Sequence, residues 1–355
     1  MPSVLVAMSG GVDSSVAACL LHEQGFDVLG SHMRLVHLDG VDHGCCGPSA
    51  RRDAAETARI AGIPFEICDL TDAFERTVLA DFASEHEAGR TPNPCARCNG
   101  EIKFGAFLRR ADQLGIDMVA SGHYVRRSEG EARWRLLRGV DRSKDQSYML
   151  HTLGQGALAR SLFPVGEIPK TETRGLAERF GLPVANKADS QELCFAPSGD
   201  AGAYARANLP HLVREGEVVD PAGAVIGGHG GAFGFTIGQR RGTGVATGER
   251  RYVVDVEPHA NRVVLGPVEL LDRRGVVADR FSWIAGRAPH GGPFEAEVRI
   301  RYRGDDVACA VEPLGDDRVR IEFRSPQRAV APGQSAVLYR GDEVLGGGRI
   351  VEALR

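Results

Sequence analysis

The chain has 355 residues, of which 25% are charged and 43% hydrophobic, and its formal net charge is −4 at pH 7. This composition is typical of a globular protein, and the length fits two or three domains rather than one. No apolar run is long enough to cross a bilayer and no leader pattern precedes the first predicted strand, so we expect a cytoplasmic protein with no membrane partner. In a reducing compartment, the eight cysteines favour thiol or metal chemistry over a disulfide framework.

Residues 1–203 predict a doubly wound α/β domain with a parallel sheet. Short apolar strands at residues 4–8, 26–30, 64–68 and 117–122 alternate with helices expected after residue 14, over 54–61 and over 101–113. Such alternation is typical of a parallel sheet with helices on both faces. Ligands bind such sheets beyond the carboxyl ends of the strands. The loops that carry residues 9–14, 33 and 122–123 are therefore expected to converge there.

The pattern changes after about residue 200. Short β-prone segments occur at residues 216–220, 251–256, 296–302, 319–323 and 336–339, and several alternate apolar with polar side chains. Glycine, proline and aspartate turns separate them. We therefore predict a small β-rich central domain over residues 204–270 and a C-terminal β-barrel over residues 271–355.

The first strand ends in the sequence Ser-Gly-Gly-Val-Asp-Ser at residues 9–14, directly before a helix. Adjacent glycines allow backbone N–H groups to face an anion, and the positive end of the helix points at the same place. The loop lacks the Gly-Lys-[Ser/Thr] ending of loops that cleave a γ-phosphate. It resembles the loop of the PP-loop ATP pyrophosphatases, whose members adenylate an oxygen atom and release pyrophosphate. An ordinary glycine-rich turn is the competing interpretation.

Basic residues gather in two runs, over residues 126–144 and 239–251. Either run could neutralise nucleic-acid phosphates, although such runs are more often solvated faces. Only four of the basic residues are lysines, whereas 39 are arginines. A compact ammonium and a planar guanidinium suit different tasks. The lysines that this scarcity singles out are Lys103, Lys144, Lys170 and Lys187.

Two cysteine motifs are candidates for thiol or metal chemistry. Cys95 and Cys98 form a Cys-x-x-Cys pair in a turn-rich stretch, and Cys194 lies in a similar setting much later. Cys98 is expected near a helix start, where amide dipoles stabilise a thiolate. A lone Cys-x-x-Cys pair supports redox and metal-binding interpretations equally.

Six longer motifs place the chain in a family. It contains, in this order, SGGVDSS, TPNPCARCNGEIKFG, SGHYVR, KDQSY, SQELCF and FTIGQRRG. Together these motifs resemble the bacterial tRNA-specific 2-thiouridylase family of the PP-loop superfamily. The resemblance implies an ATP-dependent transferase that adenylates the C2 oxygen of the tRNA wobble uridine, releases pyrophosphate and replaces that oxygen with sulfur.

The resemblance also implies roles for individual residues. The ATP-binding set is Ala7, Met8, Ser9, Gly10, Gly11, Val12, Asp13, Ser14, Met33 and Gly122, with Asp13 a candidate partner for Mg²⁺. The tRNA-binding set is Asn93, Pro94, Cys95, His123, Lys144, Asp145, Gln146, Arg301, Tyr302 and Gln334, of which the first three would contact the target base. Cys194 would receive sulfur as a persulfide from a cysteine desulfurase or sulfur-relay protein. Cys98 would act as its partner nucleophile and end the reaction in a disulfide with it.

One departure from the family pattern leaves an alternative open. Family members commonly carry aspartate where this chain has Cys95. The three residues Cys95, Cys98 and Cys194 could instead ligate an iron–sulfur cluster that delivers sulfide to the same reaction. A hypothesis of another class is an amide-forming PP-loop synthetase of a free metabolite. It would share the glycine loop but gives no reason for the cysteines or the β-rich tail.

Overall fold

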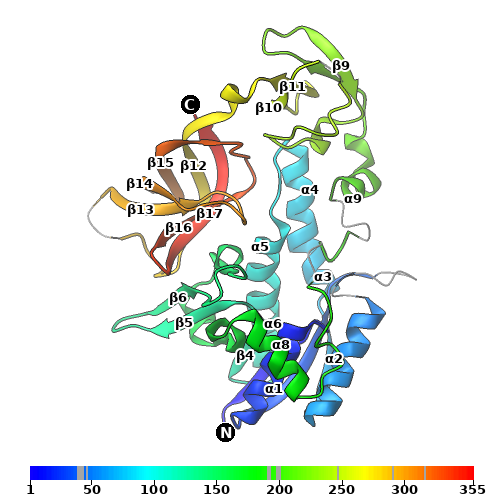
Figure 1. Ribbon diagram of the computed structural model, residues 1–355, viewed down its shortest axis with the longest axis vertical. Coiled ribbons are helices and arrows are strands. Elements are labelled where there is room, and N and C mark those ends of the chain that lie inside the picture. Colours follow the sequence, from blue (N-terminus) through cyan, green and yellow to red (C-terminus); the bar gives the residue numbers. More distant parts are fainter. Residues whose placement is uncertain are drawn as a thin grey trace.

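The computed structural model of the chain describes residues 1–37, 44, 47–189, 193–196, 201–245, 248–289, 292–315 and 317–355. Within these ranges no helix is long and apolar enough to span a membrane. In Figure 1 the parallel sheet and its helices occupy the bottom of the molecule, the barrel lies at the upper left, and the central sheet at the top.

The N-terminal sheet has five parallel strands in the order β3-β2-β1-β4-β7. Their bounds are Ser3–Ala7 for β1, Asp27–Arg34 for β2, Phe65–Asp69 for β3, Met118–Ser121 for β4 and Ser161–Leu162 for β7. The chain builds outward from β1 in one direction through β2 and β3, and later in the other through β4 and β7. The strand order therefore reverses between β1 and β4, which is where doubly wound sheets bind ligands.

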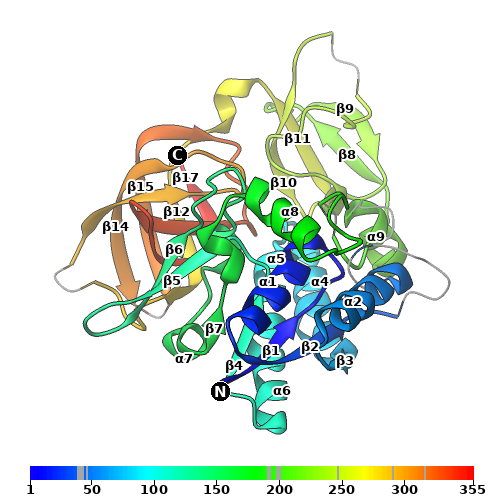
Figure 2. The ribbon, with the colours of Figure 1, turned by 60° about the horizontal axis from the view of Figure 1, so that its bottom comes forward.

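Alternate residues of β1 show that both faces of this sheet are covered. Val4 and Val6 pack with side chains of helices α1 (Val12–Glu23) and α2 (Pro48–Ala61). Leu5 packs on the opposite side with Phe107 and Leu108 of α6 (Phe107–Leu114). This period-two pattern is what a strand buried between two layers requires. Figure 2 shows α1, α2 and α8 (Lys170–Arg179) on the near side of the sheet. The predicted doubly wound class is thus confirmed.

The helix expected over residues 101–113 begins earlier than predicted. Asn93 caps α5 (Pro94–Cys98) by accepting a hydrogen bond from the backbone N–H of Ala96 at 3.2 Å, and Pro94 occupies the first helical position. The chain continues without a break through the π-helix η3 (Asn99–Ala106) into α6. Prolines at 92 and 94 suggested a turn, but Pro94 instead starts the helix.

Shorter helices complete the description. The remaining α-helices are α3 (Thr71–Phe74), α4 (Ala80–Glu87), α7 (Gln155–Ala159) and α9 (Ala201–Asn208), and the π-helix η2 is Glu75–Leu79. The 3₁₀ helices are η4 (Ser147–Leu150), η5 (Pro164–Glu167), η6 (Pro210–Leu212), η7 (Ala232–Gly234) and η8 (Val268–Leu271).

The second half of the chain is β-rich, as predicted. A four-stranded sheet in the order β10-β11-β8-β9 consists of Tyr252–Glu257, Arg262–Gly266, Gly216–Val219 and Val225–His229. The barrel follows with β12 (Asp272–Trp283), β13 (Phe294–Arg299), β14 (Val307–Gly315), β15 (Arg318–Arg328), β16 (Ser335–Arg340) and β17 (Glu343–Leu354). Because β12 pairs with both β15 and β17, the barrel closes on itself.

A hairpin that the sequence analysis did not predict joins the first domain to the barrel. Strands β5 (Val125–Glu129) and β6 (Trp134–Arg138) pair with each other, and β6 pairs with β17 of the barrel. The hairpin lies within the first basic run. Arg126 and Arg142 bind Asp342, and Arg133 binds Glu343 at 2.6 Å. Most of this run therefore neutralises barrel carboxylates rather than facing phosphates.

Arg138 is the buried centre of this junction. Its side chain is 2% exposed, lies 2.8 Å from Asp306 and 3.7 Å from Asp145, and stacks over the ring of Tyr339 at 3.6 Å. Asp145 is equally buried and also faces Arg299 at 3.6 Å. A buried carboxylate that loses one of its cations is strongly destabilised because no water replaces it.

We expect Arg138→Gln to lower the free energy of unfolding by roughly 3 kcal/mol, the usual cost of breaking a buried ion pair. Urea denaturation measures this change. The matched control is Arg135→Gln in the same strand, where the side chain is exposed and contacts Ser128. That change should cost less than about 0.5 kcal/mol. Equal losses in the two variants would contradict the role given to Arg138.

Candidate active site at the carboxyl edge of the parallel sheet

The loop between β1 and α1 is held in shape by its own residues. The backbone N–H of Ser9 donates to Ser14 Oγ at 3.2 Å, and Ser14 Oγ donates to the carbonyl of Gly11 at 3.1 Å. Gly10 has φ +70°, and a Cβ there would lie 2.1 Å from the carbonyl oxygen of Ala50 in α2. Only glycine fits this position, for both conformational and steric reasons. The loop is a preformed cradle for an anion at the start of α1.

The loop after β4 approaches this cradle at backbone distance. A Cβ on Gly122 would lie 2.5 Å from the backbone nitrogen of Ser14 and 2.6 Å from the carbonyl carbon of Asp13. Met33 lies near the end of β2, two residues beyond Ser31, which pairs with Ala7. The structure therefore brings the candidate ATP-binding residues, Ala7 to Ser14, Met33 and Gly122, to one edge of the sheet.

All four lysines of the chain gather around this edge. Lys170 Nζ lies 2.6 Å from Asp13 and 2.8 Å from Asp189, and Lys144 Nζ lies 2.9 Å from Asp189. Lys187 Nζ donates to the carbonyl of Gly10 at 2.9 Å and to Asp53 at 2.5 Å. The fourth, Lys103, lies close enough to His123 to add to the effect of burial in lowering the pKa of that imidazole. Lysine scarcity was the only sequence signal for Lys170 and Lys187, and nothing in the sequence pointed to Asp189.

The two carboxylates of this cluster, Asp13 and Asp189, each bind more than one donor. Asp13 accepts hydrogen bonds from Lys170 and from the hydroxyl of Tyr124 at 2.8 Å. Burial alone would raise the pKa of Asp189, but hydrogen bonds from Lys144 and Lys170 lower it to about 2. Asp189 therefore stays ionised and neutralises the lysines beside it. Asp13 was a candidate partner for Mg²⁺, but in the structure its carboxylate binds the ammonium of Lys170.

The candidate cysteines lie in two different environments. Cys95 is exposed in the first turn of α5, whereas Cys98 at the end of that helix is 7% exposed. Cys95 therefore lies at the start of the helix, whereas Cys98, which the sequence predicted there, lies at its end. Cys98 and the half-buried Cys194 pack into one apolar cluster with Phe82, Phe195 and Leu35. The cluster includes Met33 and therefore reaches the same sheet edge as the phosphate cradle.

Metal or disulfide linkage is not seen among these thiols. No disulfide joins the six described cysteines, and within the described ranges no group of three His, Cys, Asp or Glu residues is placed to hold a metal ion. Residues 190–192 of the SQELCF motif, together with Cys45 and Cys46, lie outside the described part of the chain. Cys19, Cys68 and Cys309 are buried, and burial raises the pKa of each thiol to about 11 or 12, as expected for inert core residues.

A short segment of the barrel fixes the loop that precedes α5. The backbone N–H of Thr91 donates to the carbonyl of Pro332 at 2.8 Å. The Gln334 amide donates to the carbonyls of Thr91 at 3.0 Å and Pro92 at 3.1 Å. Asn93 donates to Ser335 Oγ at 3.2 Å. Gln334 and Asn93, both expected at the tRNA, thus hold the barrel against the cysteine-bearing helix.

The other candidate tRNA-binding residues divide into exposed and buried groups. Arg301 is exposed, and Tyr302 is half-buried, with its pKa raised by burial and by the nearby charges of Asp145 and Cys95. Lys144 lies close to the same tyrosine. Asp145, in contrast, is buried against Arg138 and accepts from Ser147 at 2.9 Å.

Two further candidates hold local structure. Gln146 Oε1 accepts from the backbone N–H of Tyr124 at 3.0 Å. His123 is buried with its Nδ1 2.7 Å from Ser121 Oγ. The structure therefore brings Cys95 and Lys144 close to Tyr302, whereas the side chains of Asp145, Gln146 and His123 hold local structure.

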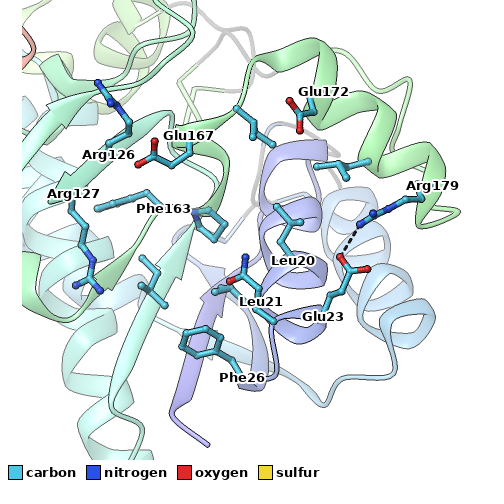
Figure 3. Close-up of a pocket in the computed structure, with 15 residues that line it drawn as sticks. Leu20, Leu21, Glu23, Phe26, Arg126, Arg127, Phe163, Glu167, Glu172 and Arg179 are labelled. Atoms are coloured by element: carbon cyan, nitrogen blue, oxygen red, sulfur yellow. Dashed lines mark hydrogen bonds and ion pairs between the residues drawn. The ribbon is translucent and has the colours of Figure 1, made fainter.

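A separate cavity of about 500 Å³ lies away from this edge (Figure 3). It is lined by the last residues of α1, among them Leu20 and Glu23, and by Phe163 and Arg179, which pairs with Glu23 at 2.7 Å. Helix α1 rises about 1.5 Å per residue, so its end lies roughly 15 Å from the cradle at its start. None of the candidate site residues lines this cavity.

The fold and the site define an α/β domain built to hold an anion at its switch point and joined to two β-rich domains. Family models match the same three parts: a tRNA methyl transferase HUP domain at residues 2–198, a tRNA methyl transferase PRC-barrel domain at 209–267, and an aminomethyltransferase β-barrel domain at 273–350.

Curated relatives match nearly the whole chain. The tRNA-specific 2-thiouridylase MnmA of Geobacter metallireducens is 45% identical, over 99% of this chain and 97% of its own. The same enzyme of Moorella thermoacetica is 45% identical over 98% of both chains, and that of Acidithiobacillus ferrooxidans is 44% identical over 98% and 97%. The chain belongs to the tRNA-specific 2-thiouridylase family.

We expect Gly122→Ala to weaken nucleotide binding roughly 100-fold, because the new methyl group overlaps the backbone of α1 and distorts the cradle. Isothermal titration with a non-hydrolysable ATP analogue measures the affinity. The control is Gly175→Ala in α8, where a Cβ meets no atom within 4 Å and the affinity should not change. Unchanged affinity in Gly122→Ala would show that the nucleotide does not use this cradle.

His151 gives the junction between barrel and site a pH dependence. Its buried Nε2 lies 3.1 Å from Ser335 Oγ, and burial lowers its pKa from 6.5 to about 4. Between these values the unfolded ring binds a proton that the folded ring does not. The contribution of His151 to the free energy of unfolding is therefore complete above pH 6.5 and falls as the pH drops toward 4.

This contribution of His151 should reach about 1.4 kcal/mol per pH unit in that interval. Urea unfolding of the wild type and of His151→Gln, measured from pH 7 to about pH 4, isolates it as the difference in slope. The glutamine keeps a polar group near Ser335 but does not titrate. Identical slopes would mean that His151 does not carry this dependence.

Proposed function

We propose that this chain uses ATP to adenylate the C2 oxygen of the wobble uridine in tRNA, and then replaces that oxygen with sulfur. The main support is that the cradle at the start of α1 and the apolar cluster holding Cys98 and Cys194 meet at the same sheet edge. In this proposal residues 1–203 form the catalytic unit, 204–270 the central domain and 271–355 the tRNA-binding barrel. The reaction takes place in the cytoplasm, where thiols stay reduced.

The first half of the reaction needs a cradle for phosphates and no protein nucleophile. The C2 carbonyl of uridine is unreactive because hydroxide is a poor leaving group. When the C2 oxygen attacks the α-phosphate of ATP, pyrophosphate leaves and the oxygen becomes part of AMP, which is a good leaving group. The backbone of residues 9–14, with Lys170 and Lys187, would hold the departing pyrophosphate by charge-assisted hydrogen bonds. Because Asp13 is bound by Lys170 and Tyr124, we assign no step to a metal ion at that carboxylate.

The second half needs sulfur in an activated form. A persulfide on Cys194, supplied by a cysteine desulfurase or a relay protein, carries it. The Cys98 thiolate attacks the inner sulfur of this persulfide and forms the Cys98–Cys194 disulfide, while the terminal sulfur leaves as hydrosulfide. The hydrosulfide attacks C2 and displaces AMP. Two external thiols, or one dithiol, then supply the two electrons that reduce the disulfide and are themselves oxidised to a disulfide.

The target uridine must leave the anticodon stack to reach this edge, as other base-modifying enzymes require. The exposed start of α5, with Asn93, Pro94 and Cys95, would receive the base. Lys144, Arg301 and Tyr302 would contact the neighbouring backbone or bases.

The iron–sulfur alternative fits the structure less well. Cys95 is exposed, Cys98 is buried, and within the described ranges no three such ligands are placed around one point. We therefore route no step through a cluster. The amide-synthetase hypothesis leaves the cysteine cluster and the barrel without a task.

Replacement of either sulfur-handling thiol should abolish thiolation. Cys98→Ser and Cys194→Ser are expected to yield no detectable 2-thiouridine in tRNA by mass spectrometry, because neither hydroxyl can carry or release sulfur, while both variants still bind ATP. Thiolation retained by Cys194→Ser would contradict the persulfide route.

Cys95→Asp separates this route from the cluster. Under the persulfide proposal the variant stays active, and protein purified without oxygen contains no iron or acid-labile sulfide. About four irons per chain, lost in Cys95→Ser, would instead establish the cluster as the sulfur source.

A further inference from the structure

The second basic run, over residues 239–251, differs from the first in that its leading arginines have no acidic partner. In the first run, Arg126, Arg133 and Arg138 bind carboxylates of the barrel. Arg240 and Arg241 are exposed, and within the part of the chain that the structure describes neither guanidinium forms an ion pair. Two adjacent guanidiniums without carboxylates are available to an anionic ligand.

The loop that carries these arginines is held in one shape by Gln239. The Oε1 atom of Gln239 accepts from the backbone N–H of Thr236 at 3.1 Å, and its Nε2 donates to the carbonyl of Arg241 at 3.0 Å. The backbone N–H of Gly238, which has φ +88°, donates to the carbonyl of Val253 in β10 at 2.8 Å. Because the loop is already ordered, a ligand bound there costs little further loss of conformational entropy.

This loop lies where the three domains meet. Thr91 Oγ1 of the N-terminal domain donates to Thr236 Oγ1 at 3.1 Å. On the barrel side, a Cβ on Gly238 would lie 2.4 Å from the Cβ of Ala329, so only glycine allows this approach. Three residues after Ala329, the carbonyl of Pro332 accepts from the backbone N–H of Thr91 at 2.8 Å. The central domain therefore holds Thr91 through its side chain, and the barrel holds it through its backbone.

The two arginines consequently lie close to the segment that would receive the target base. The backbone N–H of Gln239 donates to the carbonyl of Thr236 at 2.9 Å, which closes a turn. Since the ends of such a turn are less than about 7 Å apart, the Cα of Arg240 lies within roughly 11 Å of the Cα of Thr236. Thr236 touches Thr91, and Asn93 follows Thr91 by two residues. The long side chains of the arginine pair can therefore reach an RNA strand whose base occupies residues 93–95.

We propose that Arg240 and Arg241 bind phosphates of the tRNA strand next to the target uridine, so that the central domain takes part directly in RNA binding. The inference rests on the proposed function, since it takes residues 93–95 as the place that receives the base. An RNA strand carries one negative charge at each nucleotide, so two adjacent guanidiniums can each take a phosphate. Such contacts fix the position of the strand and do not read its sequence.

The test measures the binding of an anticodon stem-loop RNA to the full-length protein by fluorescence anisotropy, over a series of KCl concentrations. Each phosphate contact with a single strand adds about 0.7 to the slope of log K against log salt concentration. The double variant Arg240→Gln/Arg241→Gln should therefore lower the slope by about 1.4 and weaken the affinity roughly 25-fold at about 0.1 M salt. If this variant does not fold, Arg241→Gln alone should lower the slope by about 0.7.

The controls separate charge from structure. Arg240→Lys/Arg241→Lys keeps both positive charges and should keep the salt slope of the wild type. Arg109→Gln removes an exposed arginine on α6, roughly 20 Å from Asn93 along the continuous helix, and should change neither the slope nor the affinity. ATP binding, measured by isothermal titration, should be the same in every variant because none of the substitutions touches the phosphate cradle.

The outcomes distinguish this inference from the proposed function. Failure of the wild type to bind RNA would overturn both. An unchanged salt slope in the double glutamine variant would overturn the inference alone. Weaker binding of whole tRNA with unchanged binding of the stem-loop would also overturn it, because the contact would then lie far from the target base. Normal RNA binding with impaired sulfur transfer from a cysteine desulfurase would assign the two arginines to a protein partner and overturn it too.

Discussion

The close approach of the loop after β4 to the first turn of α1 is the constraint on which the site depends. With no side chain at Gly122, the backbones at Gly122 and Ser14 meet at the point where the strand order reverses. A second glycine, Gly10, lets α2 close the other side of the same loop. The cradle is therefore formed by packing of the backbone. Everything else at this edge, including the lysines and the thiols, is placed relative to it.

The barrel is part of the site and not an appendage. Its segment 332–335 holds the loop before α5, while Tyr148 donates to the carbonyl of Ser335 at 2.8 Å from the opposite side. Arg349 of β17 joins Glu85 of α4 to Asp279 of β12, with 2.6 Å to the latter. The hairpin β5–β6 extends the barrel sheet from the first domain. A movement of the barrel on RNA would therefore be transmitted directly to the helix that carries Cys95 and Cys98.

Much of the architecture was predictable because it depends on local pattern. The buried strands β1 and β4 and the alternating strands of the barrel follow directly from hydrophobic periodicity. The hairpin β5–β6 was missed because its arginines resemble a solvated face until their partners, Asp342 and Glu343, are known from the fold. The start of α5 was missed because Pro94 is equally at home in a turn and in the first turn of a helix.

The site was predictable where a motif carries the chemistry and unpredictable where a long-range partner decides it. Residues 9–14 and Gly122 meet as expected. Asp145 and Gln334 were expected to contact tRNA, yet their side chains bind Arg138 and the backbone of residues 91–92. No local signal distinguishes a polar side chain that contacts a ligand from one that holds the loop beneath it. That difference arises from burial, which the sequence does not display.

The division of labour between arginine and lysine follows from the same physical difference. Arginine's planar fork suits fixed, two-point contacts with carboxylates, and Arg349 binds both oxygens of Asp279 in this way. A fixed contact is useful between domains and unhelpful where partners must change. An ammonium has no preferred plane, so it can exchange one oxygen for another at little geometric cost. Lys144, Lys170 and Lys187 lie at the edge of the cradle, where each ammonium contacts a carboxylate and Lys187 also reaches the carbonyl of Gly10.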